Sequence, residues 1–285
     1  MDDDIDHLRQ WIGNSESSEE TIAPAPALRL LATLDDEDTL LHAGDPLPPL
    51  WHWLYFLPNA PTREIGADGH VRRGGFLPPV QLPRRMFAGA RIAFRAPLLI
   101  GETALRHREV VSVEQKDGRD GPLIFVCVKE RIEQGERVCI EEQQTVVYRG
   151  PGGPRAAAVA RPSWPQPPEG SWIRTMMPNP ALLFRFSALT FNAHRIHYDR
   201  TYAMGEEGYP GLVVHGTLLA LLLMELVRHN DPRRVTHFSF RAQAPLFDVA
   251  PFRLVGIANA QRVTLSAEGP DGARATEAEA GLAEA

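Results

Sequence analysis

The feature that most constrains the fold of this sequence is an internal repeat, in which one short segment resembles another. The segment Arg91-Ile92-Ala93-Phe94-Arg95-Ala96-Pro97-Leu98 resembles His237-Phe238-Ser239-Phe240-Arg241-Ala242, and Pro245-Leu246 follows the second copy after a short insertion. Each copy continues through a turn into a long strand-like segment, at 104–113 and at 252–260. Self-similarity of this kind indicates that one supersecondary unit occurs twice in the chain. A chance match of two short segments is the alternative.

The sequence around the two repeated segments predicts mostly strands and one buried helix. Residues 86–148 and 235–282 alternate apolar and polar side chains or form short apolar runs, which is typical of strands. Residues 215–228 are apolar on nearly every side, so a helix there should be buried. A curled antiparallel sheet around a central helix, present twice, is an α+β architecture that accounts for this layout.

Composition breaks divide the chain into two expected units. Residues 1–150 form the first repeat, the proline- and glycine-rich residues 151–171 form a linker, and residues 172–285 form the second repeat. Within the first unit, residues 1–20 read as a short helix that a Ser/Glu cluster ends. Within the second, Leu182 to Phe186 reads as a strand.

Charge and cysteine usage exclude several classes of partner. The net charge is −6, which argues against nucleic acid and against an anionic membrane surface. The N-terminus is acidic, unlike a secretory signal, and the longest apolar run, which ends at Met224, is far too short to span a bilayer. We therefore expect a cytoplasmic location. Cys127 and Cys139 fall in strand-rich text and are expected to be thiols rather than a disulfide.

One polar segment stands out as a candidate site. In Phe191-Asn192-Ala193-His194-Arg195-Ile196-His197-Tyr198-Asp199, His197 can exchange protons near neutral pH, whereas Asn192 can orient a water but cannot take its proton. Downstream, Gly216 opens the apolar helix, where unpaired backbone N–H groups face outward and can hold an oxyanion. The alternative for Gly216 is a helix-entry glycine, with His215 packed against the sheet.

These residues resemble a known family. The Phe191–Asp199 segment, together with Gly208-Tyr209-Pro210-Gly211-Leu212-Val213-Val214-His215-Gly216, is similar to the signature of the MaoC-like hydratase/dehydratase group. The resemblance is strongest to the branch with mesaconyl-C4-CoA hydratase, itaconyl-CoA hydratase and the mitochondrial type 2 3-hydroxyacyl-thioester dehydratase. It implies a double hot-dog fold and an enzyme, a carbon–oxygen lyase, that adds water to an enoyl-CoA. The implied substrate is a C5 dicarboxylyl-CoA, converted to citramalyl-CoA.

The sequence departs from the wider group at one catalytic position. That group carries an Asp where this chain has Asn192, so the resemblance leaves His197 as the main acid and base, unless Asp199 or Glu206 reaches the site. Three alternatives stay open: a dehydratase of 3-hydroxy fatty-acyl thioesters, a thioesterase, and a protein that binds acyl-CoA without turning it over. A dicarboxylate substrate requires a cation in the acyl pocket, and an all-apolar tunnel would favour the fatty-acyl alternative.

Only one copy of the motif occurs, so the first repeat is expected to be degenerate, with a missing or distorted helix that leaves room for the acyl group. The candidates for substrate binding are Trp51, Trp53, Tyr209, His215, Arg84, Arg85 and Arg195. Core packing is the alternative for the aromatic residues, and surface solvation for the arginines. We expect no metal and no cofactor, with coenzyme A arriving as part of the substrate, and a homo-oligomer, most simply a dimer. Phosphate-binding glycine loops and paired metal-ligand motifs are missing from the sequence.

Overall fold

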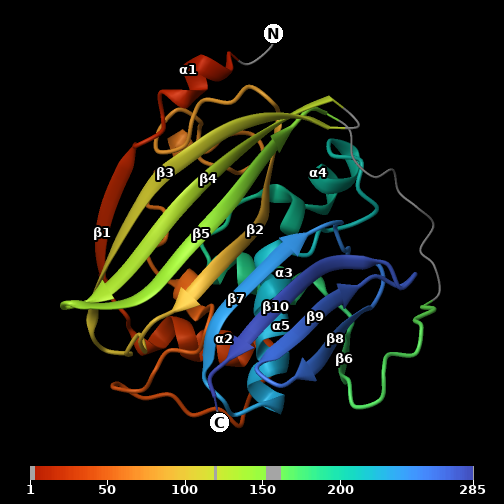
Figure 1. The fold of residues 1–285 in the computed structure, drawn as a ribbon. Helices are drawn as coiled ribbons and strands as arrows, with labels where there is room; N and C mark the ends of the chain where they lie inside the picture. Colours follow the sequence, from red (N-terminus) through yellow and green to blue (C-terminus); the bar gives the residue numbers. More distant parts are fainter. Residues whose placement is uncertain (1–3, 119–120, 152–161, 285) are drawn as a thin grey trace.

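The computed structural model describes residues 4–118, 121–151 and 162–284, and Figure 1 shows their arrangement. Ten strands form a single sheet in the order β1-β3-β4-β5-β2-β7-β10-β9-β8-β6. Their bounds are β1 Ser15–Thr21, β2 Arg84–Phe94, β3 Thr103–Gly118, β4 Gly121–Gln134, β5 Arg137–Arg149, β6 Trp172–Met176, β7 Val235–Ala242, β8 Phe252–Asn259, β9 Arg262–Glu268 and β10 Arg274–Leu282.

The strand order explains the internal repeat. Strands β1 to β5 and strands β6 to β10 follow the same order outward from a common seam, so each strand of the first half has a counterpart in the second. The repeated segments are β2 and β7, which pair with each other antiparallel at that seam, from Gly89↔Arg241 to Ala93↔His237. A Cβ atom at Gly89 would lie 2.2 Å from the carbonyl oxygen of Phe240, so only glycine allows this approach. The repeat predicted from sequence is therefore the symmetry of the sheet.

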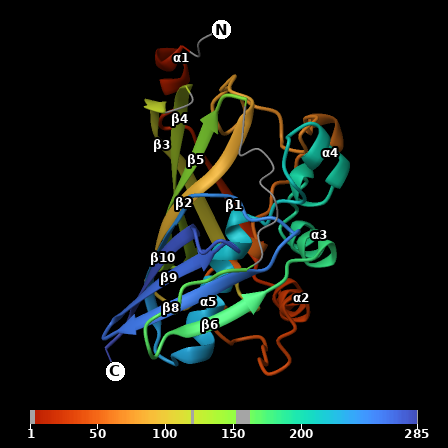
Figure 2. The ribbon, with the colours of Figure 1, turned by 90° about the vertical axis from the view of Figure 1, so that its right-hand side faces the viewer.

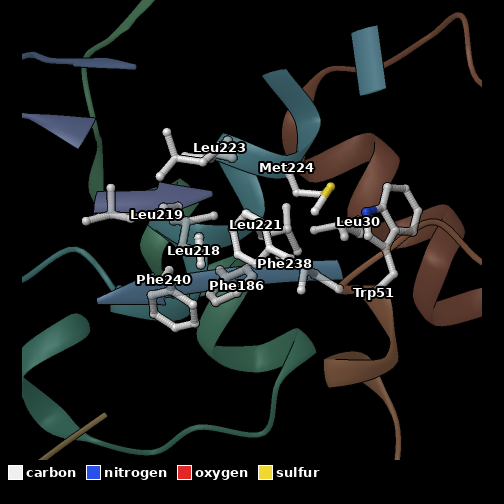
Figure 3. Close-up of a cluster of buried hydrophobic side chains, with 14 of the residues drawn as sticks. Leu30, Trp51, Phe186, Leu218, Leu219, Leu221, Leu223, Met224, Phe238 and Phe240 are labelled. Atoms are coloured by element: carbon white, nitrogen blue, oxygen red, sulfur yellow. The ribbon is translucent and has the colours of Figure 1, made fainter. Parts of the chain in front are cut away.

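The longest helix is the buried one that the sequence predicts. The helices are α1 Ile5–Arg9, α2 Pro24–Leu34, α3 Pro180–Leu189, α4 Arg200–Gly205 and α5 Gly216–Asn230, with 3-10 turns η1 Trp51–Leu54, η2 Thr62–Glu64 and η3 Arg195–His197. Residues 218–227 of α5 are all buried. Figure 2 shows α5 between the sheet and the pair α2 and α3, and Figure 3 shows its leucines packed on Phe186, Phe238 and Trp51.

Among its described residues, the first half has no helix equivalent to α5. Its helix, α2, has 11 residues and packs against α3 and η1. The inner face of β2 to β5 is covered instead by the irregular segments around Trp51–Phe56 and Phe76–Leu82. Irregular backbone covers a sheet less closely than a helix does, so there is space over this half of the sheet, where the sequence places the acyl group.

Two local predictions are wrong. Only Ile5–Arg9 of the first twenty residues is helical, and Ser15–Thr21 forms β1 because it pairs with β3 at an exposed edge, where Arg108 bonds Glu16. Leu182 to Phe186 lies in α3 rather than in a strand. The side chain of Asn179 accepts the N–H of Leu182, and Pro180 occupies the first turn, so the helix starts with two strong capping signals.

Three further expectations concern the linker, the two cysteines and the absence of a membrane-spanning helix. About half of the predicted linker, residues 152–161, lies outside the described residues. The part that follows packs on the second half, where Trp164 donates to the carbonyl oxygen of Gly269 at 2.6 Å. Cys127 and Cys139 are both free thiols, half-buried and buried respectively. Within the described chain, every helix is too short or too polar to cross a bilayer.

Candidate active site

The predicted motif forms a connection between α3 and α4 that lies over the start of α5. His197 is buried at the end of η3, and its Nδ1 lies 2.8 Å from the carbonyl oxygen of Val213. A carbonyl can only accept, so Nδ1 carries the hydrogen and the lone pair of the neutral ring is on Nε2. His197 therefore presents a proton acceptor to the site.

The histidines around His197 are held in their neutral forms. The ring of His215 stacks on His197 with centroids 3.6 Å apart, and Ser187 Oγ lies 2.8 Å from His215 Nε2. Burial lowers the pKa of His197 to about 4, although the bond to Val213 opposes this shift. Burial also lowers the pKa of His215 well below its usual value, and the neighbouring His197 adds to the effect. At neutral pH both rings are uncharged.

Gly216 is the first residue of α5, as the oxyanion prediction requires. The side chain of His215 does not cap the helix, and the N–H of Gly216 donates no hydrogen bond within the described chain. A Cβ atom at Gly216 would lie 3.9 Å from the carbonyl oxygen of Phe87 on β2. The N–H of Gly216 thus has no hydrogen-bond acceptor within the described chain, and Gly216 directly follows His215, whose ring stacks on that of His197.

Asn192 contributes to the shape of the motif. Its side-chain oxygen accepts the backbone N–H of His194 at 3.0 Å, and its own N–H donates to Ser187 at 2.8 Å. Within the described chain no hydrogen bond joins Asn192 to His197. The side-chain NH2 remains available to orient a water, which is the role predicted from sequence.

Neither carboxylate proposed from sequence approaches His197. Asp199 caps α4 through Tyr202 and bonds Arg195 at 2.7 Å, and Glu206 is exposed beyond the end of α4. These contacts account for both side chains.

A different carboxylate lies beside the motif, and the sequence analysis missed it. Asp68 Oδ2 bonds His70 Nδ1 at 2.9 Å, the ring of His70 lies 3.9 Å from that of His194, and His194 lies 5.4 Å from His197. Burial is the largest influence on these pKa values: it lowers that of His194 to about 2, whereas bonding to His70 holds that of Asp68 far below its usual value despite burial.

The turn that carries Asp68 is locked onto the motif. The N–H of Arg195 donates to the carbonyl oxygen of Asp68 at 2.9 Å. Gly69 has φ +90°, and a Cβ atom there would lie 1.7 Å from the carbonyl oxygen of Ala193. The sequence does contain a turn signal here: in Asp68-Gly69-His70, an acidic residue and a histidine flank a glycine within a proline-rich stretch.

Asp68, His70 and His194 are also close enough together to share a metal ion. The Asp68–His70 hydrogen bond already satisfies the carboxylate, and the rings of His70 and His194 are in contact at a tilt of 38°. This arrangement explains the cluster without a metal, and the expectation of no metal stays a prediction.

The predicted substrate-binding residues separate into groups. Arg84 bonds Glu207 at 3.0 Å and lies over the ring of Tyr209, which is itself buried. Arg195 is bonded to Asp199. Arg85 stands near His70 and His194 and lowers the pKa of both.

The two tryptophans differ in position. Trp51 is fully buried and donates to Glu225 of α5 at 2.8 Å, so it belongs to the core and not to a pocket. Trp53 lines a cavity of about 200 Å³ over the inner face of the first half of the sheet. Thr190, two residues before Asn192, lines the same cavity, so the pocket adjoins the motif.

Comparison with known proteins identifies the family. Residues 50–248 match the sequence model of hydroxyacyl-thioester dehydratase type 2. The chain belongs to this family. It is 56% identical over 268 residues to mesaconyl-C4-CoA hydratase from Chloroflexus aurantiacus, and the match covers 94% of this chain and 95% of that protein. The family resemblance drawn from the sequence is thus confirmed, and the chain is a hydratase/dehydratase of the acyl-thioester type.

Solved structures confirm the fold. A MaoC-like dehydratase superposes with a TM-score of 0.71 at 14% identity, covering 96% of this chain and 99% of that one. A Mycobacterium tuberculosis protein described as having a double hot-dog fold superposes with a TM-score of 0.59 at 13% identity, covering 98% and 97%. The double hot-dog fold predicted from the sequence is thus confirmed.

Proposed function

We propose that this protein hydrates the double bond of mesaconyl-C4-CoA, or of a closely related C5 dicarboxylyl-CoA, to give citramalyl-CoA. The observation that carries the proposal is the placement of His197, whose Nε2 lone pair faces the site while Nδ1 is held by Val213. The near full-length identity to a mesaconyl-C4-CoA hydratase supports the substrate class.

The chemistry follows from two groups. Nε2 of His197 accepts a proton from water as the water oxygen bonds to the β-carbon, and the π electrons move onto the thioester oxygen. The N–H of Gly216 stabilises this enolate oxygen. The imidazolium then delivers its proton to the α-carbon, so the same ring serves as base and acid. Hydration changes no net oxidation state, and we propose that coenzyme A enters only as part of the substrate.

Asn192 and the Asp68–His70 pair have supporting roles in this proposal. The NH2 group of Asn192 orients the attacking water, while the turn at Asp68 holds His194 and the motif in place. The carboxylate that the wider group supplies from within its motif is thereby replaced by one from the first repeat.

The alternative, dehydration of long 3-hydroxyacyl chains, uses the same catalytic groups but needs an extended apolar tunnel. The cavity beside the motif is lined by charged side chains as well as aromatic ones, which favours a short polar acyl group. The other alternative, a protein that only binds acyl-CoA, leaves the buried neutral imidazole of His197 without a purpose.

The test is a panel assay with the wild-type protein. Mesaconyl-C4-CoA, itaconyl-CoA and crotonyl-CoA are offered at matched concentrations, and loss of enoyl absorbance is followed together with product identity. We expect the highest kcat/KM for the dicarboxylyl substrates, with citramalyl-CoA as product. Faster hydration of crotonyl-CoA, or no hydration of any of the three, would contradict the proposal.

We also propose that the protein acts in the cytoplasm as a dimer. The acidic composition and the intracellular supply of acyl-CoA support the location, and the exposed edge strand β1 offers a surface for pairing. Light scattering of the purified protein tests the dimer, which a monomeric mass would contradict.

A further inference from the structure

A row of charged side chains crosses the inner face of the first half of the sheet. Arg108, Glu130 and Glu142 stand directly opposite one another on β3, β4 and β5. Apolar clusters lie on both sides of the row, one including Ile132 and Ile140 and the other Val126 and Val128. Glu130 and Glu142 are both buried. Charged groups in such a position are costly unless they have partners, so the row requires an explanation.

The cavity beside Trp53 lies directly over this row. Its floor includes Arg106, Arg108, Glu130, Ile132 and Gln144, and the segment around Tyr55 and Phe56 forms its wall. The pocket is therefore a polar chamber within an apolar half of the molecule.

Most charges around the chamber already have partners. Glu142 receives hydrogen bonds from His52 at 2.8 Å, from Trp53 at 3.1 Å and from Gln144 at 3.0 Å. Arg108 is bonded to Glu16 at 2.6 Å. These groups are satisfied without a ligand.

Two charged groups at the chamber, Arg106 and Glu130, lack such partners. Arg106 has no ion pair within 4.0 Å in the described chain, and its buried Nε has no hydrogen-bond partner there. Its guanidinium lies over the ring of Phe56, 5.2 Å from the centroid. Glu130 makes no side-chain hydrogen bond within the described residues, and burial, reinforced by Glu142, raises its pKa. Arg106 and Arg108 oppose this shift of the Glu130 pKa. Arg106 therefore brings its N–H donors to the chamber beside the carboxyl group of Glu130.

The chamber adjoins the segment that carries His197, since Thr190 lines it on that side. The indole of Trp53 lines the chamber and also packs against Phe87, with ring centroids 6.3 Å apart. The carbonyl of Phe87 is the group that faces Gly216. Three strand spacings of about 4.8 Å separate β2, which carries Phe87, from β3, which carries Arg106, and the long arginine side chain covers part of that distance. A short acyl group can bridge the remainder.

We propose that this chamber binds the carboxylate at the far end of the acyl group, and that Arg106 is the cation that recognises it. The N–H donors of Arg106 match the acceptors of a carboxylate, and a guanidinium holds such a group with two hydrogen bonds. The inference rests on the proposed function in that the ligand is an acyl-CoA. It assigns the preference for a dicarboxylyl group to one residue of the degenerate first repeat.

The test compares two saturated ligands that the enzyme cannot hydrate. Methylsuccinyl-CoA with its thioester at C4 and isovaleryl-CoA differ only in a carboxylate against a methyl group, and calorimetry measures their Kd values. We expect the wild-type protein to prefer methylsuccinyl-CoA. Arg106→Gln should weaken methylsuccinyl-CoA binding by about tenfold to a hundredfold, the usual effect of removing a hydrogen bond to a charged group, and leave isovaleryl-CoA binding unchanged. Arg106→Lys should restore part of the difference.

The control is Arg131→Gln, which removes an arginine of β4 that pairs with Glu133 outside the chamber. It should leave both Kd values unchanged. The inference is overturned if Arg106→Gln weakens both ligands equally, or neither. Failure of the proposed function looks different, because the wild-type protein would then keep its binding preference yet hydrate no dicarboxylyl enoyl-CoA.

Discussion

The Nδ1 atom of His197 lies 2.8 Å from the carbonyl oxygen of Val213, and this one contact determines which nitrogen of the ring faces the substrate. The motif that contains His197 and the strand-like residues before α5 are thereby joined. Burial of the ring between His194 and His215 keeps it neutral, so the acceptor on Nε2 is present throughout the neutral range.

The pH dependence of the reaction should reflect this neutral ring. Because the pKa of His197 is lowered to about 4, the fraction of enzyme with a free Nε2 stays near one from pH 8 to pH 5. We expect log kcat/KM for mesaconyl-C4-CoA to be flat over this range. An inflection near pH 6.5, the pKa of an exposed imidazole, would show that His197 is solvated or paired differently.

Stability should change with pH in the same region. His194, His197 and His215 have folded-state pKa values below the value of about 6.5 for an unfolded chain. Between pH 6.5 and 4 the unfolded chain therefore binds more protons, and the free energy of unfolding falls as pH falls. Thermal unfolding at pH 7, 6 and 5 measures this.

Two variants calibrate that measurement. His215→Asn should make the pH dependence of Tm shallower, because it removes one of the buried rings. His7→Gln, at an exposed histidine of α1, should leave the dependence unchanged. An equal slope in all three proteins would contradict the assignment.

Gly216 offers a test of the oxyanion site that spares the helix. Proline is well tolerated at the first position of a helix, and His215 already has the extended ψ of 134° that proline requires before it. Gly216→Pro removes the N–H and adds a pyrrolidine ring at the start of α5, and it should lower kcat by about a hundredfold or more. Gly216→Ala keeps the N–H and adds a Cβ atom with ordinary contacts, so it should cost little. Similar losses in the two variants would mean that space, not the N–H, matters.

The carboxylate of Asp68 should matter more than that of Asp199. Asp68→Asn removes the charge that orients His70 beside His194, and we expect about a tenfold loss of kcat. Asp199→Asn keeps a good helix cap and loses only a half-exposed ion pair, so its kcat should stay within about twofold. Steady-state kinetics of both variants, with circular dichroism to check folding, decide the matter.

Features encoded locally were predictable from the sequence. Strand alternation and the resemblance between β2 and β7 predict the doubled sheet, and the uniformly apolar run predicts α5. Helix α3 was misread because a run such as Leu182 to Phe186 fits either a strand or a helix, and its cap at Asn179 decides between them. The edge strand β1 was missed because its pairing partner, β3, lies some ninety residues away in the chain.

The same distinction between local and long-range features applies to the residues of the site. His197, Asn192 and Gly216 belong to one contiguous motif and could be recognised together. Asp68 and His70 come from the first repeat, and they are brought near the motif by the packing of Gly69 on Ala193 and the hydrogen bond from Arg195 to Asp68. The charged row under the chamber depends on the register of three strands, and that register is set by turns and a bulge. No single segment of the sequence therefore predicts the row.

The central claim is that His197 accepts a proton from water and delivers it to the α-carbon during hydration. One variant tests this claim most directly. His197→Gln retains a polar side chain of similar reach but cannot exchange a proton. The measurement is kcat for mesaconyl-C4-CoA in wild type and variant, beside the Kd of methylsuccinyl-CoA. We predict a fall in kcat of about a thousandfold or more, with Kd within about threefold. A variant that hydrates as fast as the wild type would contradict the account.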